Sequence, residues 1–450
     1  MANRVKVDVV VVGAGISGLV AARRLDQAGV DVCVVEASDR VGGRLLNVEV
    51  APGIELEVGG RAVGGQEHTQ ALVEELGAKT FGGYNWGGDT VWHFDGARTV
   101  GGDFPMSSAS RNVYQRAVAE LDALASQVSP REPWNAPLAK ELDRITFESW
   151  LLDNVQDERA RWAVLLDLII AFVTPPWRVS MLHVVATIAA IGSLAEADKL
   201  MTRRIAGGGA GLCRTMADQL DGRVHLSSPV ERIEWSSAGV TVHSGELAIE
   251  CRQAVVAMSP ADAHWISFKP GLPWDRDQFH RHFQMGSGVI SLLVYETPFW
   301  RDQGLSGAAA TDLPGGGHID DSSPEDGSIG VLNSFVCPMP EGLPWGAPRG
   351  ILDTPEDRRR AVTAAAVAAF GGQAAKPVRY IEKDWMNERF IAGVQAAMPP
   401  GLITETGPSM FVSKGPLHWC SSEQGMRWAL TMNGAIESGQ RIAANVVELI

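Results

Sequence analysis

The sequence predicts an α/β fold, and the order of elements at its N-terminal end carries that prediction. A short apolar run has the pattern of a buried strand, and a G-x-G-x-x-G turn follows it at once. A helical pattern comes next, then a second apolar strand that ends in an acidic residue. This order is typical of a unit that binds a dinucleotide. The elements are the strand 7–12, the glycines Gly13, Gly15 and Gly18, the helix 19–28, the strand 30–35 and the acid Glu36.

Each of the three glycines has its own role in such a turn. Gly13 permits the tight turn, Gly15 lets the backbone approach a pyrophosphate, and Gly18 lets the helix pack closely on the strand. The start of the helix offers free N–H groups and a positive dipole end to the phosphates. Glu36 follows the glycine turn at about the spacing that is typical of the acid that binds a ribose hydroxyl. The turn by itself does not separate FAD from NAD.

Size and composition indicate a globular protein of two or three domains. The chain has 450 residues, of which 45% are hydrophobic and 20% charged. Its net charge of −14 argues against nucleic acid and anionic membrane surfaces as partners. The most apolar later stretches, 163–173 and 181–195, are too short or too interrupted to cross a bilayer.

The cysteines indicate a reducing compartment. The five are widely spaced and form no C-x-x-C pair, so the sequence predicts neither a disulfide framework nor a zinc or other metal site. The first strand begins too early to leave room for a signal peptide. We therefore expect a cytoplasmic protein.

Beyond the first unit, the chain mixes helical and strand-like segments. Helices are expected at 110–195, 353–370 and 434–449. Alternating apolar residues predict strands at 223–226, 230–235, 239–243, 254–257 and 289–295. The segment 308–348 is rich in Gly, Pro and Asp, so we expect loops around short strands there. This order suggests domains assembled from several chain segments.

With the link Arg-Val-Gly-Gly-Arg at 40–44, the chain resembles the flavin-containing amine oxidases, the monoamine and polyamine oxidase group. The resemblance extends over nearly the whole chain, and its motifs come in the family's order. These are GIELEVGGR at 53–61, GGGAG at 207–211, YETPFW at 295–300, Trp385 with Gly393, and the closing region 422–439 with Trp428.

The resemblance implies two domains that are interleaved in sequence. A Rossmann-like FAD-binding domain would comprise residues 1–79, 206–279 and 388–450. A substrate domain with a mixed sheet and helices would comprise 80–205 and 280–387. The active site would lie between them, where ligand clefts usually form.

The resemblance also implies which residues bind FAD. Glu36 would bind the adenosine ribose, Arg44 the pyrophosphate, and Val230 the adenine through its backbone. Glu423 would hold the ribityl and pyrophosphate region, and Met432 with the following helix start would face the flavin's pyrimidine edge. Gly59, Gly60 and Arg61 would form the flavin loop, and Trp385 would either pack beside the flavin or be an ordinary core residue. The position that carries cysteine in covalently flavinylated members is Val394, so we expect non-covalent FAD. Cys420 is expected to be a buried apolar residue.

Two departures from the family concern the substrate side. Many members carry a lysine at the position of Ile290, so no catalytic residue is assigned and rapid reaction with oxygen is left open. Gln395 and Thr431 occupy the positions of two tyrosines that flank the amine. This favours a more polar substrate, or it reflects drift within the family. The expected pocket residues are Phe172, Thr202, Ile290, Phe335, Gln395 and Thr431.

Several other polar residues have side chains that suit either a site or a structural role. Arg61 would bind either a substrate carboxylate or, as we favour, the cofactor or the protein itself. For four histidines a structural role is favoured over that of a general base, and turn chemistry is favoured for Asp320 and Asp321. The four histidines are His93, His183, His318 and His418.

The function that the resemblance implies is FAD-dependent oxidation of a C–N bond. The amine would transfer a hydride to flavin N5, the imine would hydrolyse, and oxygen or another acceptor would reoxidise the flavin, oxygen giving hydrogen peroxide. The alternatives are an L-amino acid oxidase, a desaturase or dehydrogenase on the same scaffold, or a non-catalytic flavin-binding protein. An NAD-only dehydrogenase is disfavoured. The expected partner is a small amine, and a homodimer is considered for the assembly.

Overall fold

The computed structural model describes residues 3–83, 87–286, 288–337, 339, 346 and 350–450. Its first layer is a five-stranded sheet in which every neighbouring pair is parallel. Parallel strands are buried on both faces and read as continuous apolar runs, as the four valines of β2 do. In spatial order the strands are β10 (Val224–His225), β3 (Val32–Val35), β2 (Val9–Val12), β14 (Gln253–Val256) and β23 (Leu417–Trp419).

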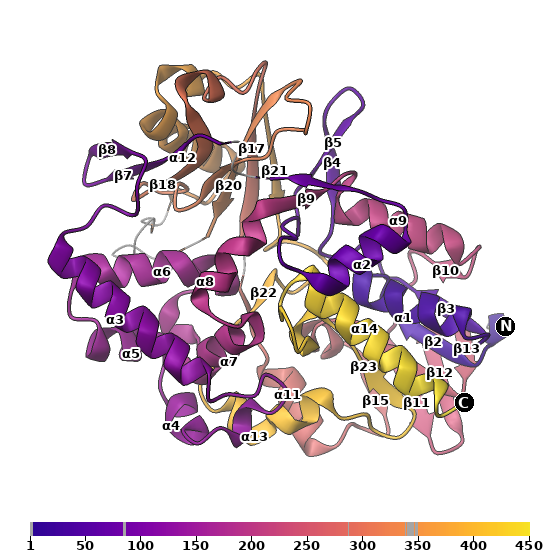
Figure 1. The fold of residues 1–450 in the computed structure, drawn as a ribbon. Helices are drawn as coiled ribbons and strands as arrows, with labels where there is room; N and C mark the ends of the chain where they lie inside the picture. Colours follow the sequence, from indigo (N-terminus) through magenta and orange to yellow (C-terminus); the bar gives the residue numbers. More distant parts are fainter. Residues whose placement is uncertain (1–2, 84–86, 287, 338, 340–345, 347–349) are drawn as a thin grey trace.

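Helices cover one face of the parallel sheet, and a second sheet covers the other (Figure 1). The helices are α1 (Ile16–Gln27), α2 (Glu67–Glu75), α9 (Gly208–Gln219) and α14 (Met432–Val447). The second sheet has the order β1 (Asn3–Lys6), β13 (Leu247–Cys251), β12 (Gly239–Ser244), β11 (Arg232–Ser236) and β15 (Ser267–Lys269).

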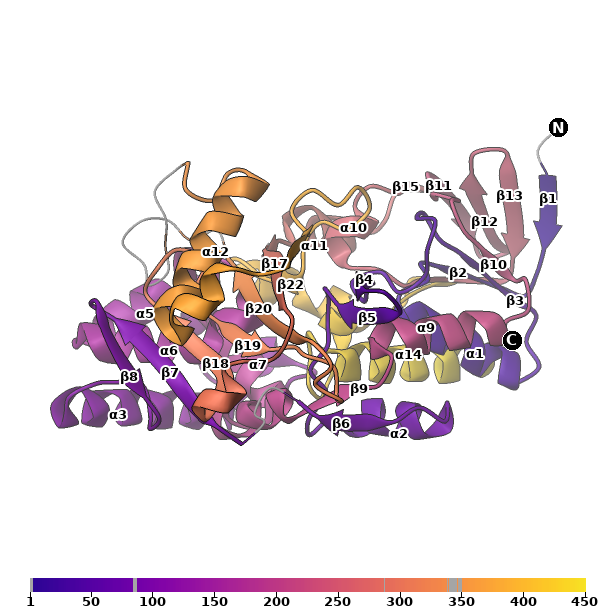
Figure 2. The ribbon, with the colours of Figure 1, turned by 90° about the horizontal axis from the view of Figure 1, so that it is seen from above.

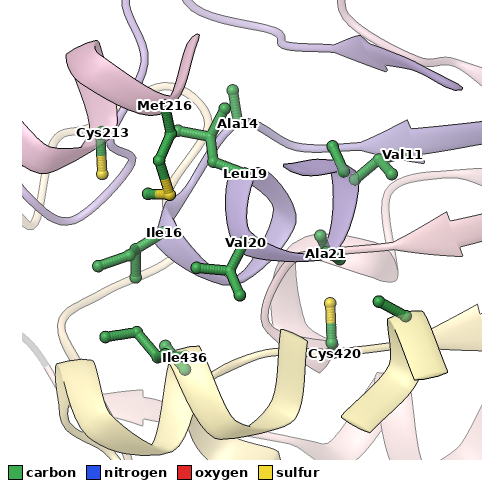
Figure 3. Close-up of a cluster of buried hydrophobic side chains, with 14 of the residues drawn as sticks. Val11, Ala14, Ile16, Leu19, Val20, Ala21, Cys213, Met216, Cys420 and Ile436 are labelled. Atoms are coloured by element: carbon green, nitrogen blue, oxygen red, sulfur yellow. The ribbon is translucent and has the colours of Figure 1, made fainter. Parts of the chain in front are cut away.

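The core between α1, α9 and α14 contains two of the cysteines (Figure 3). Cys213 and Cys420 are fully buried, and burial raises the pKa of each thiol to about 12. They therefore act as small apolar residues. All five cysteines are buried and free of disulfides.

A seven-stranded mixed sheet forms the second half of the molecule. Figure 2 shows it at the opposite end from the parallel sheet, with the hairpin of β4 (Asn47–Ala51) and β5 (Ile54–Glu57) between them. The helix α12 (Pro355–Phe370) packs on one face. The strand order is β21 (Arg379–Asp384), β17 (Val289–Tyr295), β20 (Gly330–Val336), β19 (Ile319–Asp321), β18 (Leu305–Thr311), β7 (Asp89–Phe94) and β8 (Ala97–Val100).

A group of helices with its own apolar core completes the molecule (Figure 1). The helices are α3 (Ser108–Ala125), α4 (Ala139–Arg144), α5 (Phe147–Asn154), α6 (Glu158–Phe172), α7 (Met181–Ile191), α8 (Leu194–Ala197), α10 (Pro260–Ala263), α11 (Trp274–His282) and α13 (Leu402–Thr406). Two short strand pairs join the parts. They are β6 (Thr80–Gly82) with β9 (Arg203–Ile205), and β16 (Met285–Gly286) with β22 (Gln395–Ala396).

The predicted α/β class is confirmed. Segment 308–348, where we expect loops around short strands, contains β19, β20 and part of β18, and all three are strands of the large sheet. The strands are buried on both faces, and β18 consists largely of alanine, serine and glycine, so alternation of polar and apolar residues is absent. Residues 338, 340–345 and 347–349 of this segment lie outside the described residues. The domain boundaries stay a prediction. No described helix is both long and apolar enough to cross a membrane.

Candidate active site

A single cavity of about 830 Å³ is lined by residues of both the parallel sheet and the seven-stranded sheet. Its volume lies in the upper part of the range of about 300–1,000 Å³ that is usual for ligand pockets. One end is lined by the glycine turn after β2, and the other by the N-terminus of α14 and the start of β17. Most of the residues that the sequence singled out therefore lie around one space.

The glycine turn is built by close contacts within the protein. Gly13 has a φ of +107°, and a Cβ on it would lie 2.6 Å from the carbonyl oxygen of Ala257. A Cβ on Gly18 would lie 2.1 Å from the Gly13 oxygen. A Cβ on Gly15, in contrast, would meet no protein atom within 4 Å. Gly15 is thus the turn glycine whose open side faces the cavity rather than the protein.

Glu36 lies at the same end of the cavity and is 7% exposed. Its Oε2 accepts a hydrogen bond from the Ala14 N–H at 2.7 Å, and its Oε1 accepts one from the Ser38 N–H at 2.9 Å. These bonds fix the carboxylate. Val230 also lines this end.

Arg44 lies on the cavity wall and is held by a buried carboxylate behind it. Its Nη1 and Nη2 donate to the two oxygens of Glu423 at 2.7 and 3.2 Å, and Nη1 also donates to the Val394 carbonyl at 3.0 Å. Burial alone would raise the pKa of Glu423, but the charge and hydrogen bonds of Arg44 hold it below its usual value. Glu423 itself is not among the residues that line the cavity, and its role beside the ribityl and pyrophosphate region stays a prediction. In the structure it positions Arg44.

The N-terminus of α14 faces the other end of the cavity. Thr431 is the N-cap residue, but its side chain does not cap the helix, because Oγ1 donates to the Trp428 carbonyl at 2.6 Å. The N-cap of α1, Gly15, also lacks a capping side chain. Two helix N-termini without a side-chain cap, and hence two positive dipole ends, therefore line one cavity.

The seven-stranded sheet contributes one face to the wall. Ile290 lies opposite Phe335 of the neighbouring strand β20, and both line the cavity. On its other side Ile290 lies opposite Lys383 of the edge strand β21. The Lys383 ammonium pairs with Glu388 and lies 5.1 Å from the centre of the Trp385 ring. Lys383 thus lies one strand away from Ile290, which occupies the position of the family's lysine.

The loop after β21 closes this end of the cavity. Trp385 is buried and donates from Nε1 to the Val58 carbonyl at 2.8 Å, so it both lines the cavity and ties the flavin loop to the sheet. Val394 and Gln395 follow on the wall. The Oε1 of Gln395 is buried and has no hydrogen-bond partner among the described residues. A buried acceptor is costly when unpaired, so this oxygen is available to accept a hydrogen bond from a ligand in the cavity.

Arg61 joins the flavin loop to the large sheet. Its Nη2 donates to Asp320 Oδ2 at 2.6 Å, and its Nη1 donates to Ser322 Oγ at 2.8 Å. Asp320 and Asp321 end the buried strand β19, and Asp321 accepts from Arg301 Nε at 2.9 Å. The prediction of turn chemistry for these two residues is therefore incomplete, because each also pairs with an arginine.

Two expected pocket residues do not line the cavity. Phe172 ends α6 and packs on His183, whereas Val173, with a φ of +51°, lies on the wall. Thr202 is exposed and donates to the Lys199 carbonyl at 2.6 Å, and Leu200 takes the place on the wall. In both cases the chain changes direction within one or two residues.

Close contacts within the protein explain the glycines of the flavin loop. A Cβ on Gly59 would lie 2.2 Å from the Arg44 carbonyl oxygen, and one on Gly60 would lie 2.9 Å from Leu45. Both glycines and Met432 line the cavity.

Part of the cavity wall consists of residues that were not predicted from the sequence. Asp262 lines the cavity and accepts hydrogen bonds from the Ala392 N–H at 2.7 Å and from Ser259 Oγ at 2.7 Å. The Ser-Pro-Ala-Asp pattern at 259–262 is a helix-start signal that could have drawn attention to it. Most residues of 386–392 also line the cavity, and no sequence pattern marks them.

Comparison with known proteins identifies the family. The family model of flavin containing amine oxidoreductase matches residues 16–447. The chain is therefore a flavin-containing amine oxidoreductase.

Relatives of this amine oxidoreductase match over nearly their whole length. A putrescine oxidase of Kocuria rosea is 35% identical over 98% of this chain and 95% of its own. An L-amino acid dehydrogenase of Synechocystis is 31% identical over 100% of this chain and 97% of its own. Among solved structures, a wild-type putrescine oxidase bound to putrescine has a TM-score of 0.93 at 32% identity, covering 99% of this chain and 100% of its own. The cyclohexylamine oxidase of Brevibacterium oxydans has a TM-score of 0.92 at 30% identity, covering 98% of this chain and 99% of its own.

FAD is the cofactor of this amine oxidoreductase family, and the residues present fit it. The cavity offers the open side of Gly15 and the uncapped N-termini of α1 and α14. These are the features that bind the phosphates of a dinucleotide and favour negative charge.

Proposed function

We propose that this flavin enzyme oxidises the C–N bond of an amine to an imine, which water then hydrolyses. FAD, when bound, accepts the hydride from the α-carbon of the amine. The observation that carries the proposal is the shared cavity, which joins the dinucleotide end to a chamber lined by Ile290, Phe335 and Gln395. In this chamber the buried Gln395 Oε1 has no hydrogen-bond partner among the described residues. Family membership and relatives named for amine substrates support it.

The residues of the chamber suit a neutral amine. Gln395 Oε1 would accept from the amine N–H and orient the substrate, while Ile290 and Phe335 exclude water from the reacting carbon. The N-terminus of α14 favours negative charge at its end of the cavity. A neutral amine needs no dedicated base in the site.

We propose further that the residues of the dinucleotide end hold FAD without a covalent bond. Glu36 would bind the adenosine ribose and Arg44 the pyrophosphate, as its planar fork suits phosphate oxygens. Val230, Met432 and Trp385 would border the rings. Val394 carries no nucleophile. A cytoplasmic location and a homodimeric assembly stay predictions from the sequence.

The test is reduction of the bound flavin in the absence of air. The purified protein is mixed anaerobically with a panel of amines and a panel of L-amino acids while the flavin absorbance is followed, and air is then admitted. We expect amines to bleach the flavin and amino acids not to, because Arg61 is already paired with Asp320. Bleaching by amino acids alone would favour the amino acid alternative, and no bleaching by either panel would contradict the proposal. The rate of recovery in air distinguishes an oxidase from a dehydrogenase.

Gln395→Ala should lower kcat/KM for the best amine by about 2- to 10-fold, which is the range for one neutral hydrogen bond. The FAD content should stay that of the wild type. Steady-state kinetics and the flavin-to-protein absorbance ratio measure the two quantities. Gln373→Ala is the matched control, because Gln373 is an exposed amide that bonds Gln303 far from the cavity wall. Equal effects of the two substitutions would remove Gln395 from the site.

A further inference from the structure

His318 is the one histidine on the cavity wall among the residues that the structure describes. It directly precedes β19, and its carbonyl accepts a hydrogen bond from the Phe335 N–H at 3.2 Å. Ile319 lies opposite Ser334, so His318 lies opposite Phe335. Phe335 in turn lies opposite Ile290. Residues opposite one another on neighbouring strands project to the same face, so the three form one row along the chamber.

A buried carboxylate lies beside the imidazole. His318 Nε2 is buried and lies 3.2 Å from Asp320 Oδ2. Burial would raise the pKa of Asp320, but Arg61 and His318 lower it to about 2, so the carboxylate is ionised at neutral pH. Asn333 and Ser322 donate further hydrogen bonds to it at 3.0 and 2.8 Å. An ionised carboxylate beside Nε2 favours the tautomer that carries its proton on Nε2.

In that tautomer the other nitrogen, Nδ1, is a hydrogen-bond acceptor. No described residue bonds to it, and the side chain is 27% exposed. The chamber therefore has two acceptors on its wall, His318 Nδ1 and Gln395 Oε1. The apolar side chains of Ile290 and Phe335 lie in the row beside His318. Because neighbouring strands are about 4.8 Å apart, His318 lies about 10 Å along the row from Ile290.

The charges around His318 disfavour a second ammonium group. The described carboxylates that line the cavity are Glu36, Asp262 and Glu388, and each already has a hydrogen-bond or ion-pair partner. Beside His318, the side chain of Arg61 is more exposed than that of Asp320, at 10% against 2%. The charge nearest to the cavity surface at this point is therefore positive.

We propose that His318 binds a second, uncharged hydrogen-bond donor of the substrate, such as a hydroxyl group, and so selects amino alcohols over plain alkylamines and diamines. Asp320 is the positioning residue that presents Nδ1. The proposal rests on the proposed function for the identity of the reacting group, but the binding preference has a measurement of its own.

The test compares three linear amines of equal chain length, with a methyl, a hydroxyl or an ammonium group at the far end. For the wild-type holoenzyme, kcat/KM should be highest for the amino alcohol. His318→Leu should lower that value by about 2- to 10-fold, as expected for one neutral hydrogen bond, and should lower the value for the alkylamine by a smaller factor. His318→Asn, which keeps an acceptor, should restore part of the preference. His282→Leu is the control, because His282 is an exposed residue at the end of α11 and does not line the wall.

Binding is measured separately with the corresponding amines that lack an α-hydrogen and cannot be oxidised. Their dissociation constants come from the change in flavin absorbance on titration. A hydroxyl preference that disappears in His318→Leu supports the inference even if no amine is oxidised, in which case only the proposed function fails. Oxidation without a hydroxyl preference, a wild type that prefers the diamine, or equal losses on all three amines would overturn the inference and leave the proposed function standing.

Discussion

Gly18→Ala should abolish FAD binding. The new Cβ would lie 2.1 Å from the Gly13 carbonyl oxygen and 2.9 Å from the Ala257 Cβ, so α1 must move away from the turn. The Gly13 carbonyl belongs to the backbone and cannot move aside as a flexible side chain can. Such overpacking typically lowers the free energy of unfolding by about 1–3 kcal/mol. The shift would also displace the N-terminus of α1, which lines the cavity. The flavin-to-protein absorbance ratio and the melting temperature measure both effects.

Substitutions at two other glycines distinguish steric crowding within the protein from loss of the surface that contacts FAD. Without FAD, the Gly15→Ala protein should have a melting temperature near that of the FAD-free wild type, because the new Cβ meets no protein atom within 4 Å. It should nevertheless weaken FAD binding by about tenfold or more, as expected when a charge-assisted hydrogen bond to a phosphate is lost. Gly211→Ala in α9 also meets nothing within 4 Å and is absent from the cavity wall, so it should leave both quantities unchanged. Normal FAD content in Gly18→Ala would contradict this account of the turn.

Glu423→Gln should destabilise the protein by about 3–5 kcal/mol at neutral pH, the usual cost of removing one partner from a buried ion pair. Glu423 is 0% exposed and Arg44 27% exposed, so Gln at 423 would leave the guanidinium partly buried without its counter-charge. The guanidinium would also lose its fixed orientation on the cavity wall, so FAD should bind more weakly. Urea unfolding of the holoenzyme measures the first effect.

The sign of the pH dependence gives an independent check. The pKa of Glu423 is lowered in the folded state, so the pair stabilises the protein above the usual glutamate range and this stabilisation is lost as pH falls. The difference between wild type and Glu423→Gln should therefore shrink below about pH 4. Glu75→Gln is the matched control, because Glu75 pairs with Arg23 and Arg24 at the surface, where such pairs contribute about 0–1 kcal/mol. Equal losses in the two variants would refute a special role for the buried pair.

The sequence predicted those parts of the site that depend on local pattern. The strand, turn, helix and acid from 9 to 36 follow one another directly, so each residue's place is set by its neighbours. The last helix was likewise readable from its periodicity and lies at Met432–Val447. Resemblance to the family added Ile290, Gln395 and Thr431, which the structure places on the cavity wall.

What the sequence did not reveal depends on strand register and on partners far apart in the chain. Lys383 lies beside Ile290, and His318 beside Phe335, only because four strands align in one way. A shift of one residue would turn these side chains to the other face. The partners Arg44 and Glu423 are separated by 379 positions. Phe172 and Val173 show the same limit at a helix end, where one backbone turn decides which side chain faces the ligand.

The late position of α14 in the chain has a consequence for how the enzyme is made. The helix contributes Thr431 and Met432 to the cavity wall and packs along α1 at the other end of the sequence. Domains form during synthesis from the N-terminus onward, so the glycine turn emerges from the ribosome long before its partner helix. The complete pocket for the nucleotide therefore arises only after α14 has also left the ribosome. Flavin loading is then a step of maturation, and chains that stall earlier would be colourless targets for proteolysis.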